Sequence, residues 1–117
     1  MKRSLSVVLA LLFLSTAFLS ACGEPSREEY RDMAAEEVCD EAERCNSLGS
    51  TSYGDCIIEQ RARFNDFWPS SQCSDGRISE ERYNRCMNRA RTAACDGNFF
   101  DQLSAASDCR ASQVCVN

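Results

Sequence analysis

Nine cysteines are the most reactive side chains in this 117-residue sequence, which contains no histidine. A cysteine thiol can act as a nucleophile, ligate a metal ion, carry a lipid or form a disulfide. Cys22 closes an apolar N-terminal segment. The other eight are spread over the rest of the chain: Cys39, Cys45, Cys56, Cys73, Cys86, Cys95, Cys109 and Cys115. The compartment in which the chain folds decides which of these reactions is open to each thiol.

The segment before Cys22 has the parts of a bacterial export signal. Lys2 and Arg3 supply a basic start, and an almost uninterrupted apolar run follows from Leu5 to Leu19. The run ends in Leu19-Ser20-Ala21-Cys22, which resembles a lipobox, the cleavage and lipidation signal of exported lipoproteins. The alternative is a transmembrane anchor, but residues 5–21 number only 17, the lower limit for a helix that spans a bilayer.

This signal divides the chain into three segments. We expect residues 1–21 to be a signal peptide that is removed, residues 22–25 to be a lipidated N-terminus and short tether, and residues 26–117 to be a helical cysteine-rich domain. Acyl chains on Cys22, at about 0.8 kcal/mol per buried CH₂, would make a stable membrane anchor. Gly23 is not the aspartate that resembles an inner-membrane retention signal. We therefore expect a location in the bacterial cell envelope, on the periplasmic face of the outer membrane or on the cell surface.

In an exported chain, the eight remaining cysteines predict four disulfides. The alternative is a thiolate metal site, which favours cysteines with two residues between them, whereas here the intervening residues number 5, 10, 16, 12, 8, 13 and 5. We therefore expect no metal and no other cofactor. The domain after cleavage has 117 − 21 = 96 residues and a correspondingly small core, so the disulfides would supply much of its stability. Cys45 and Cys56 lie at the facing ends of two predicted helices and are expected to pair.

Residues suited to catalysis are scarce outside the cysteines. The sequence lacks histidine, the commonest general base, and has no Gly-x-Ser-x-Gly motif and no glycine-rich phosphate loop. A cysteine nucleophile needs an unpaired thiol, and eight thiols pair evenly. We therefore predict that the protein is not an enzyme.

Arg82, Arg85 and Arg89 are candidate binding residues because of their spacing. Steps of three and four residues along a helix could align them to clamp a carboxylate or a phosphate. The alternative is that they lie in water or pair with the acidic face of the first predicted helix. The acidic residues of that face are Glu36, Glu37 and Glu43. Trp68 is a candidate anchor for a partner, although a single tryptophan at a helix end also fits core packing.

The charge balance argues against nucleic acid as a partner. Lys2 is the only lysine, so loss of residues 1–21 leaves 13 − 2 = 11 basic residues, all arginine, against 18 acidic residues, a net charge of 11 − 18 = −7. A surface of that sign repels phosphate backbones and anionic lipid headgroups. We expect the membrane to be contacted through lipidated Cys22.

The elements that must position these residues are predicted to be helices. Ser26 and Glu29 form a capping box at the start of a first amphipathic helix, and Asn46 ends it. Ser52 begins a second helix, which Pro69 ends because proline cannot continue the hydrogen-bond ladder.

Ser79 caps a third predicted helix, whose buried stripe extends to Ala93 and Ala94. Gly97 is suited to the left-handed position that follows a helix, and Asn98 begins a fourth helix. The tail from residue 109 to 115 is expected to form a short helical turn. No window alternates apolar and polar residues as a strand does. The predicted fold class is therefore all-α, a small disulfide-stapled bundle of about four short helices.

Cysteine spacing and a few neighbouring stretches carry a family resemblance. These stretches are Ala34-Ala35 to Cys39, Cys45, Tyr53 to Cys56, Arg61-Ala62-Arg63, Trp68-Pro69, Cys73, Cys86, Cys95, Cys109 and Val114-Cys115. They are similar to small lipoproteins found largely in myxobacteria, which carry a domain of unknown function and are labelled natural product biosynthesis lipoproteins. The resemblance implies an association with biosynthetic gene clusters, and it brings no catalytic or binding residues.

These observations predict a lipid-anchored, non-catalytic envelope lipoprotein. We expect an accessory protein of natural product (secondary metabolite) biosynthesis or export, holding an envelope protein or a small-molecule product. The alternative is a general cell-surface structural or protein-interaction module unrelated to biosynthesis.

Overall fold

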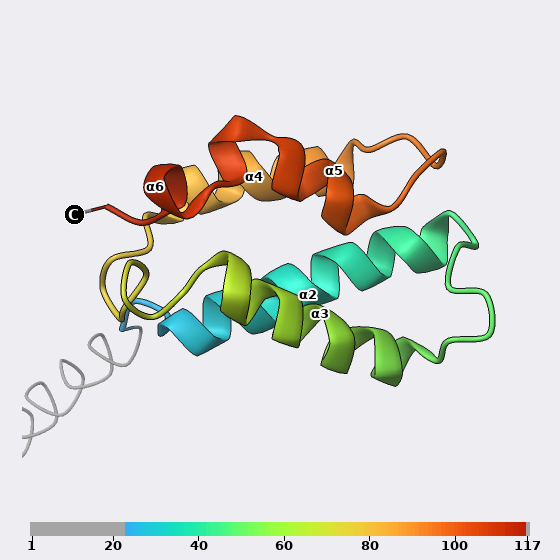
Figure 1. Cartoon of the computed structure of the whole chain (residues 1–117), viewed down its shortest axis with the longest axis horizontal. Helices are drawn as coiled ribbons and strands as arrows, with labels where there is room; N and C mark the ends of the chain where they lie inside the picture. Colours follow the sequence, from blue (N-terminus) through green and yellow to red (C-terminus); the bar gives the residue numbers. More distant parts are fainter. Residues whose placement is uncertain (1–22, 117) are drawn as a thin grey trace, which may run out of the picture.

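The computed structural model describes residues 23–116, which fold into a helical bundle (Figure 1). The elements are α2 (Arg27–Arg44), α3 (Tyr53–Phe67), α4 (Glu80–Arg91), α5 (Phe99–Ala105), the 3₁₀ turn η1 (Ser107–Cys109) and α6 (Ala111–Val114). Within this range the only β-type pairing is an isolated bridge between Ile78 and Cys115. The predicted all-α fold is confirmed. The predicted signal peptide and Cys22 lie outside the described residues.

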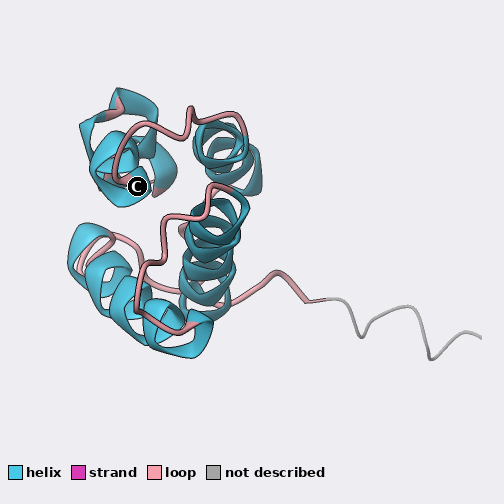
Figure 2. Cartoon of the chain, turned by 90° about the vertical axis from the view of Figure 1, so that its right-hand side faces the viewer, coloured by secondary structure: helices cyan, strands magenta, loops and turns pink. Residues whose placement is uncertain are grey.

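The helices form two layers. Helices α2 and α3 lie side by side in one layer, and α4 lies with α5 and α6 in the other (Figures 1 and 2). The start of α2 and α6 lie at the same end of the bundle (Figure 1). No helix in residues 23–116 is long and apolar enough to cross a membrane.

Helix starts follow the capping residues that the sequence indicates. Ser26 accepts a hydrogen bond from the Glu29 amide at 3.2 Å while its own amide donates to Glu29 Oε2 at 2.7 Å, which completes the capping box. Ser52, Ser79 and Asn98 cap α3, α4 and α5 in the same way through their side-chain oxygens. These contacts are local, so the sequence alone could place them.

The end of α2 depends on Asn46, which adopts the left-handed conformation with φ of 51°. The Asn46 amide donates to the Glu43 carbonyl at 2.9 Å, and the Ser47 amide donates to the Ala42 carbonyl at 2.8 Å. This pair of bonds is the Schellman motif, which satisfies carbonyls that a helix end leaves open. The predicted stop at Asn46 is confirmed.

The end of α4 differs from the prediction. The helix ends at Arg91, where the Thr92 hydroxyl donates to the Asn88 carbonyl at 2.7 Å, so Ala93 and Ala94 lie beyond it and Ala94 is exposed. The left-handed glycines of the described chain are Gly49 and Gly76, so the conformation predicted for Gly97 is wrong. The loop that follows carries Cys95 back to α2 through a disulfide, which a local pattern does not encode.

All eight cysteines in the described chain form disulfides, as predicted. The pairs are Cys39–Cys56, Cys45–Cys95, Cys73–Cys115 and Cys86–Cys109. The predicted Cys45–Cys56 pair is wrong. Cys39, on the buried face of α2, is the residue that meets Cys56 at the start of α3, whereas Cys45 lies beyond the helix and faces the loop after α4. Two of the bridges therefore join segments 50 and 42 residues apart and hold the two layers together.

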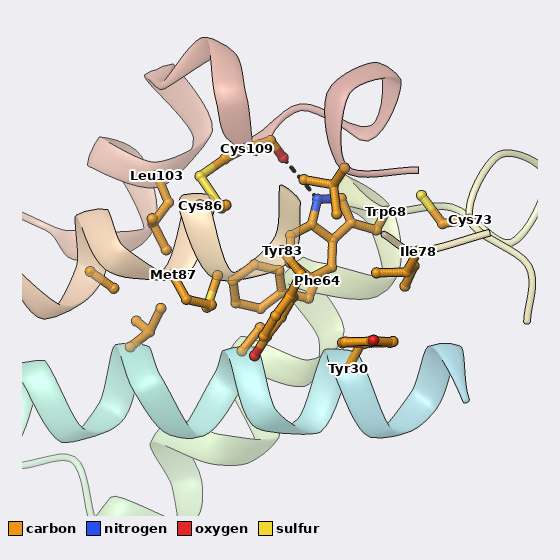
Figure 3. Packing of buried hydrophobic residues seen from close by; sticks show 14 of the residues in the cluster. Tyr30, Phe64, Trp68, Cys73, Ile78, Tyr83, Cys86, Met87, Leu103 and Cys109 are labelled. Carbon is orange, nitrogen blue, oxygen red and sulfur yellow. Dashed lines mark hydrogen bonds between the residues drawn. A yellow bond between two sulfur atoms is a disulfide. The ribbon is translucent and has the colours of Figure 1, made fainter. Parts of the chain in front are cut away.

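The core between the layers is centred on aromatic side chains (Figure 3). Phe64 and Trp68 pack with ring centroids 4.9 Å apart, and Tyr30 and Tyr83 pack at the same distance across the layers. The indole Nε1 of Trp68 donates to the Cys109 carbonyl at 2.8 Å, so a buried polar group has its partner (Figure 3). The described core residues and all four disulfides lie between Tyr30 and Cys115.

Candidate functional site

The three arginines predicted to bind an anion do not converge on one point. Arg82 donates to the Gln113 carbonyl at 3.1 Å. Arg85 pairs with Glu81 on its own helix at 2.8 Å. Arg89 pairs with Asp108 at 2.7 Å, and this hydrogen bond lowers the pKa of the Asp108 carboxyl.

These contacts favour the alternative interpretation of the arginine face. Each of the three guanidinium groups has a partner of its own, on α4 itself or on the C-terminal segment. The predicted pairing with the acidic face of α2 occurs at the next arginine, where Arg91 meets Glu37 at 2.5 Å. Arg82, Arg89 and Arg91 thus join α4 to other segments of the bundle, whereas Arg85 pairs within α4. The three candidate arginines do not form a clamp for a carboxylate or phosphate.

Trp68 lies in the core and is only 1% exposed. Its ring packs between Phe64 and Tyr83, and its polar atom is already bonded to Cys109. A surface contact would require the bundle to open, so the candidate binding role of Trp68 is corrected to core packing.

A groove between α2 and α4 is the best-formed candidate site, and it was not predicted. We call it the α2–α4 groove; it has a volume of about 330 Å³. Its lining residues are Pro25, Tyr30, Met33, Glu36, Glu37, Asp40, Glu80, Tyr83, Asn84 and Arg91. The lining residues on α2 and those on α4 are about 40 or more positions apart in the sequence. A local sequence pattern therefore could not predict the groove, which forms when the two helices pack together.

Tyr30 gives this groove an unsatisfied polar atom. The side chain is 2% exposed, yet its hydroxyl has no hydrogen-bond partner. Burial is the main cause of its raised pKa, and the nearby carboxylates of Glu80 and Glu24 raise the pKa further. Glu80 also lines the groove. A buried hydroxyl without a partner costs about 1–3 kcal/mol, so a group that bonded to it would be stabilised.

The charges around the groove are mostly negative. Its lining includes four carboxylates, from Glu36, Glu37, Asp40 and Glu80, and one guanidinium, from Arg91. Arg91 forms an ion pair with Glu37. Asp40 accepts a hydrogen bond from the Tyr53 hydroxyl at 2.7 Å.

Two of these carboxylates, unlike Glu37 and Asp40, have no partner within the described residues. Glu36 and Glu80 form no ion pair within the described chain, and both are exposed at the groove. The groove therefore combines a negative rim with the rings of Tyr30 and Tyr83 and the thioether of Met33.

A second cleft, of about 400 Å³, lies at the opposite end of α2. It includes Gln60, which is 8% exposed and whose Oε1 has no hydrogen-bond partner. Its charged lining residues, Glu59 and Arg63, form an ion pair at 2.5 Å and cancel each other. We call it the distal cleft, because it lies beside the loop that follows α2 rather than at the start of that helix.

The described chain does not present a metal centre. No group of three or more histidine, cysteine, aspartate or glutamate residues in positions 23–116 is arranged to hold a metal ion. All eight thiols of this range are in disulfides, so none of them is available as a ligand or nucleophile.

Fold and disulfides together define a small all-α domain stapled by four bridges. Residues 39–117 match the model of a family of unknown function, DUF6184, and the chain belongs to that family. The matched range contains all eight disulfide cysteines and begins within α2, after Tyr30, Met33 and Glu36. No curated protein and no solved structure matches the chain.

Proposed function

We propose that this protein is a lipid-anchored, non-catalytic envelope lipoprotein that acts by binding close to the membrane. The α2–α4 groove is its binding site, and the observation that carries the proposal is the unpartnered hydroxyl of Tyr30 in that groove. Support for the anchor comes from the lipobox-like Leu19-Ser20-Ala21-Cys22, which lies outside the described residues.

A role in natural product biosynthesis or export rests on the resemblance to myxobacterial lipoproteins with that label. We propose that the protein holds a small-molecule product, or an envelope protein that handles it, rather than transforming the product. The sequence supports this division because it lacks histidine, the commonest general base. A general cell-surface module is the competing function, and the test below separates the two.

The length of the tether supports a role at the membrane surface. Only Gly23, Glu24 and Pro25 separate the proposed lipidated residue from the cap of α2. At about 3.3–3.6 Å per extended residue, the domain rises on the order of 10 Å from the bilayer. Pro25, which is three residues after Cys22 in the sequence, itself lines the α2–α4 groove.

A deletion strain tests this function. It is complemented with the native chain, with Cys22→Ala, and with a chain that carries about twenty Gly/Ser residues between Gly23 and Glu24. The same insert appended after Asn117 is the control, because it adds equal length without moving the domain from the membrane. We expect the native chain and the control to restore the small-molecule profile of the cells, measured by mass spectrometry, and the other two to restore it poorly.

Two results would contradict the proposal. If Cys22→Ala still reaches the mature mass and fractionates with membranes, the lipidation assignment is wrong. If the deletion leaves the small-molecule profile unchanged while it alters cell-surface adhesion or envelope integrity, the general cell-surface module is the better account.

A further inference from the structure

We propose that the α2–α4 groove binds a small amphiphilic molecule that carries a protonated primary amine, with the ammonium group between Tyr30, Glu36 and Glu80. This inference rests on the proposed function only in taking the same groove as the binding site. It adds the chemical class of the ligand.

The first argument is hydrogen bonding. The Tyr30 hydroxyl is buried without a partner, and a phenolic oxygen accepts a hydrogen bond from an N–H donor. An ammonium group has three such donors and no acceptor, so it can bond to the phenolic oxygen and to carboxylates at the same time. An anionic ligand group would be repelled by the same carboxylates.

The second argument is charge. Glu36 projects from α2 and Glu80 from the first turn of α4, and both line the groove without an ion pair in the described chain. Two uncompensated carboxylates beside a low-dielectric wall attract a cation more strongly than the same pair in open water. The distal cleft lacks this feature, because its only glutamate is paired with Arg63.

The third argument is the apolar wall. Met33 is 37% exposed, which makes it one of few large apolar side chains at the surface of the described domain. It lies in the groove with Pro25 and the rings of Tyr30 and Tyr83. A thioether adapts to irregular apolar groups, and aromatic faces attract cations. These surfaces suit the hydrocarbon part of an amphiphile.

The size of the groove favours a small molecule. At about 330 Å³ it is at the lower end of the range of small-ligand pockets, about 300–1,000 Å³. A bare metal ion would leave this apolar wall unused, and no metal-binding group was found in residues 23–116.

The test uses the mature chain with Cys22→Ser, which contains the whole core and all four disulfides but no lipid. Hexylammonium is the probe, and hexanol and hexanesulfonate are probes of equal chain length with no charge and with negative charge. Binding is followed by NMR shifts of backbone and methyl signals. We expect hexylammonium to shift the signals of Tyr30, Met33 and Tyr83, hexanol to bind more weakly, and hexanesulfonate not to bind.

Variants locate the ammonium group. Glu36→Gln combined with Glu80→Gln should weaken hexylammonium binding by about tenfold, since it removes both unpaired carboxylates. Glu43→Gln is the matched control, because Glu43 is an exposed α2 residue outside both clefts, and it should leave binding unchanged. Binding by the native domain should weaken with added salt.

Tyr30→Phe separates a binding role from a purely structural one. Removal of an unpartnered hydroxyl should raise the midpoint of thermal unfolding of the free domain and weaken hexylammonium binding by about threefold to tenfold. A structural role alone would change only the first of these measurements.

Three outcomes overturn this inference: absence of hexylammonium binding, equal binding of hexylammonium and hexanesulfonate, or equal effects of the Glu36/Glu80 and Glu43 variants. None of them bears on whether Cys22 anchors the protein or whether the anchor is needed in cells. Failure of the ligand class is therefore distinguishable from failure of the proposed function.

Discussion

Tyr30 Oη and Gln60 Oε1 are buried polar atoms without a hydrogen-bond partner, and the two residues line different clefts of the domain. A third such atom, Arg61 Nε, lies 3.1 Å from Asp32 Oδ1 in an ion pair. Trp68 illustrates the contrast, because its indole N–H is bonded to the Cys109 carbonyl. An unsatisfied buried group lowers stability, and such groups are rare in folded proteins. Of these groups, Tyr30 is the one for which we propose a ligand.

Trp68→Phe should destabilise the domain by about 2–4 kcal/mol. The substitution removes part of a buried ring and leaves the Cys109 carbonyl without its donor. Chemical denaturation followed by circular dichroism measures the change. Tyr53→Phe serves as the control, because its hydroxyl bonds at the surface, and its effect should be small. A loss below about 0.5 kcal/mol for Trp68→Phe would contradict the core position assigned to this residue.

Tyr53 should titrate with an apparent pKa of about 12 rather than 10.0, chiefly because its hydroxyl donates to Asp40. The folded state therefore binds more protons than the unfolded state between these two values, so stability is highest below pH 10.0 and falls as pH rises toward about 12. NMR of the labelled Tyr53 ring measures this pKa. Asp40→Ala should return it toward 10.0, and an unchanged value would exclude the hydrogen bond as the cause.

At the scale of elements, the helix ends explain what the sequence can and cannot predict. The starts of α2, α3, α4 and α5 depend on caps within three residues, and the sequence predicts them correctly. The wrong expectation for Gly97 arose because the loop path there is set by the bridge from Cys45 to Cys95. A local pattern carries no information on such a partner 50 residues away.

The candidate site was harder to predict than the fold. The sequence places Tyr30 and Met33 on an apolar face of the first helix and Glu36 and Glu37 on an acidic one, but the site forms where α4 covers the boundary between them. The spacing of Arg82, Arg85 and Arg89 is a local pattern, and it predicted a clamp. Their partners, Gln113 and Asp108, come from the C-terminal segment and turn the candidate clamp into bundle contacts.

Asn46 offers a test of how α2 ends. Asn46→Gly should be neutral or stabilise by a few tenths of a kcal/mol, because glycine has no Cβ to oppose the left-handed conformation. Asn46→Val should destabilise by about 1–2 kcal/mol, since a β-branched residue opposes that conformation most. Thermal unfolding of both variants measures the difference. Equal stability of the two would contradict the Schellman end.

In the molecule as a whole, two disulfides join segments that are far apart in the sequence. Cys45–Cys95 joins the two layers at one end, and Cys73–Cys115 joins the C-terminal segment to the loop before α4. These cross-links limit the freedom of the unfolded chain, which matters most for a domain with a small core. They also hold α2 and α4 in the relation that forms the groove.

Removal of the Cys45–Cys95 bridge by the double change Cys45→Ser and Cys95→Ser should lower the free energy of unfolding by about 2–4 kcal/mol, as measured by chemical denaturation.

Cleavage of the domain without reduction, followed by peptide mass spectrometry, should recover the four disulfide pairs. The intact domain should gain eight hydrogens on reduction. A peptide that links Cys45 to Cys56 would contradict the arrangement of the layers.

In the proposed function, the anchored domain holds an amine-bearing small molecule in the α2–α4 groove. The most direct measurement compares envelope extracts from a deletion strain that carries, at matched abundance, the anchored native chain, the Glu36→Gln/Glu80→Gln variant or the Glu43→Gln control. Mass spectrometry of these extracts should find amine-containing species retained with the native chain and the control, and depleted with the double variant. Equal profiles from all three strains would contradict the claim.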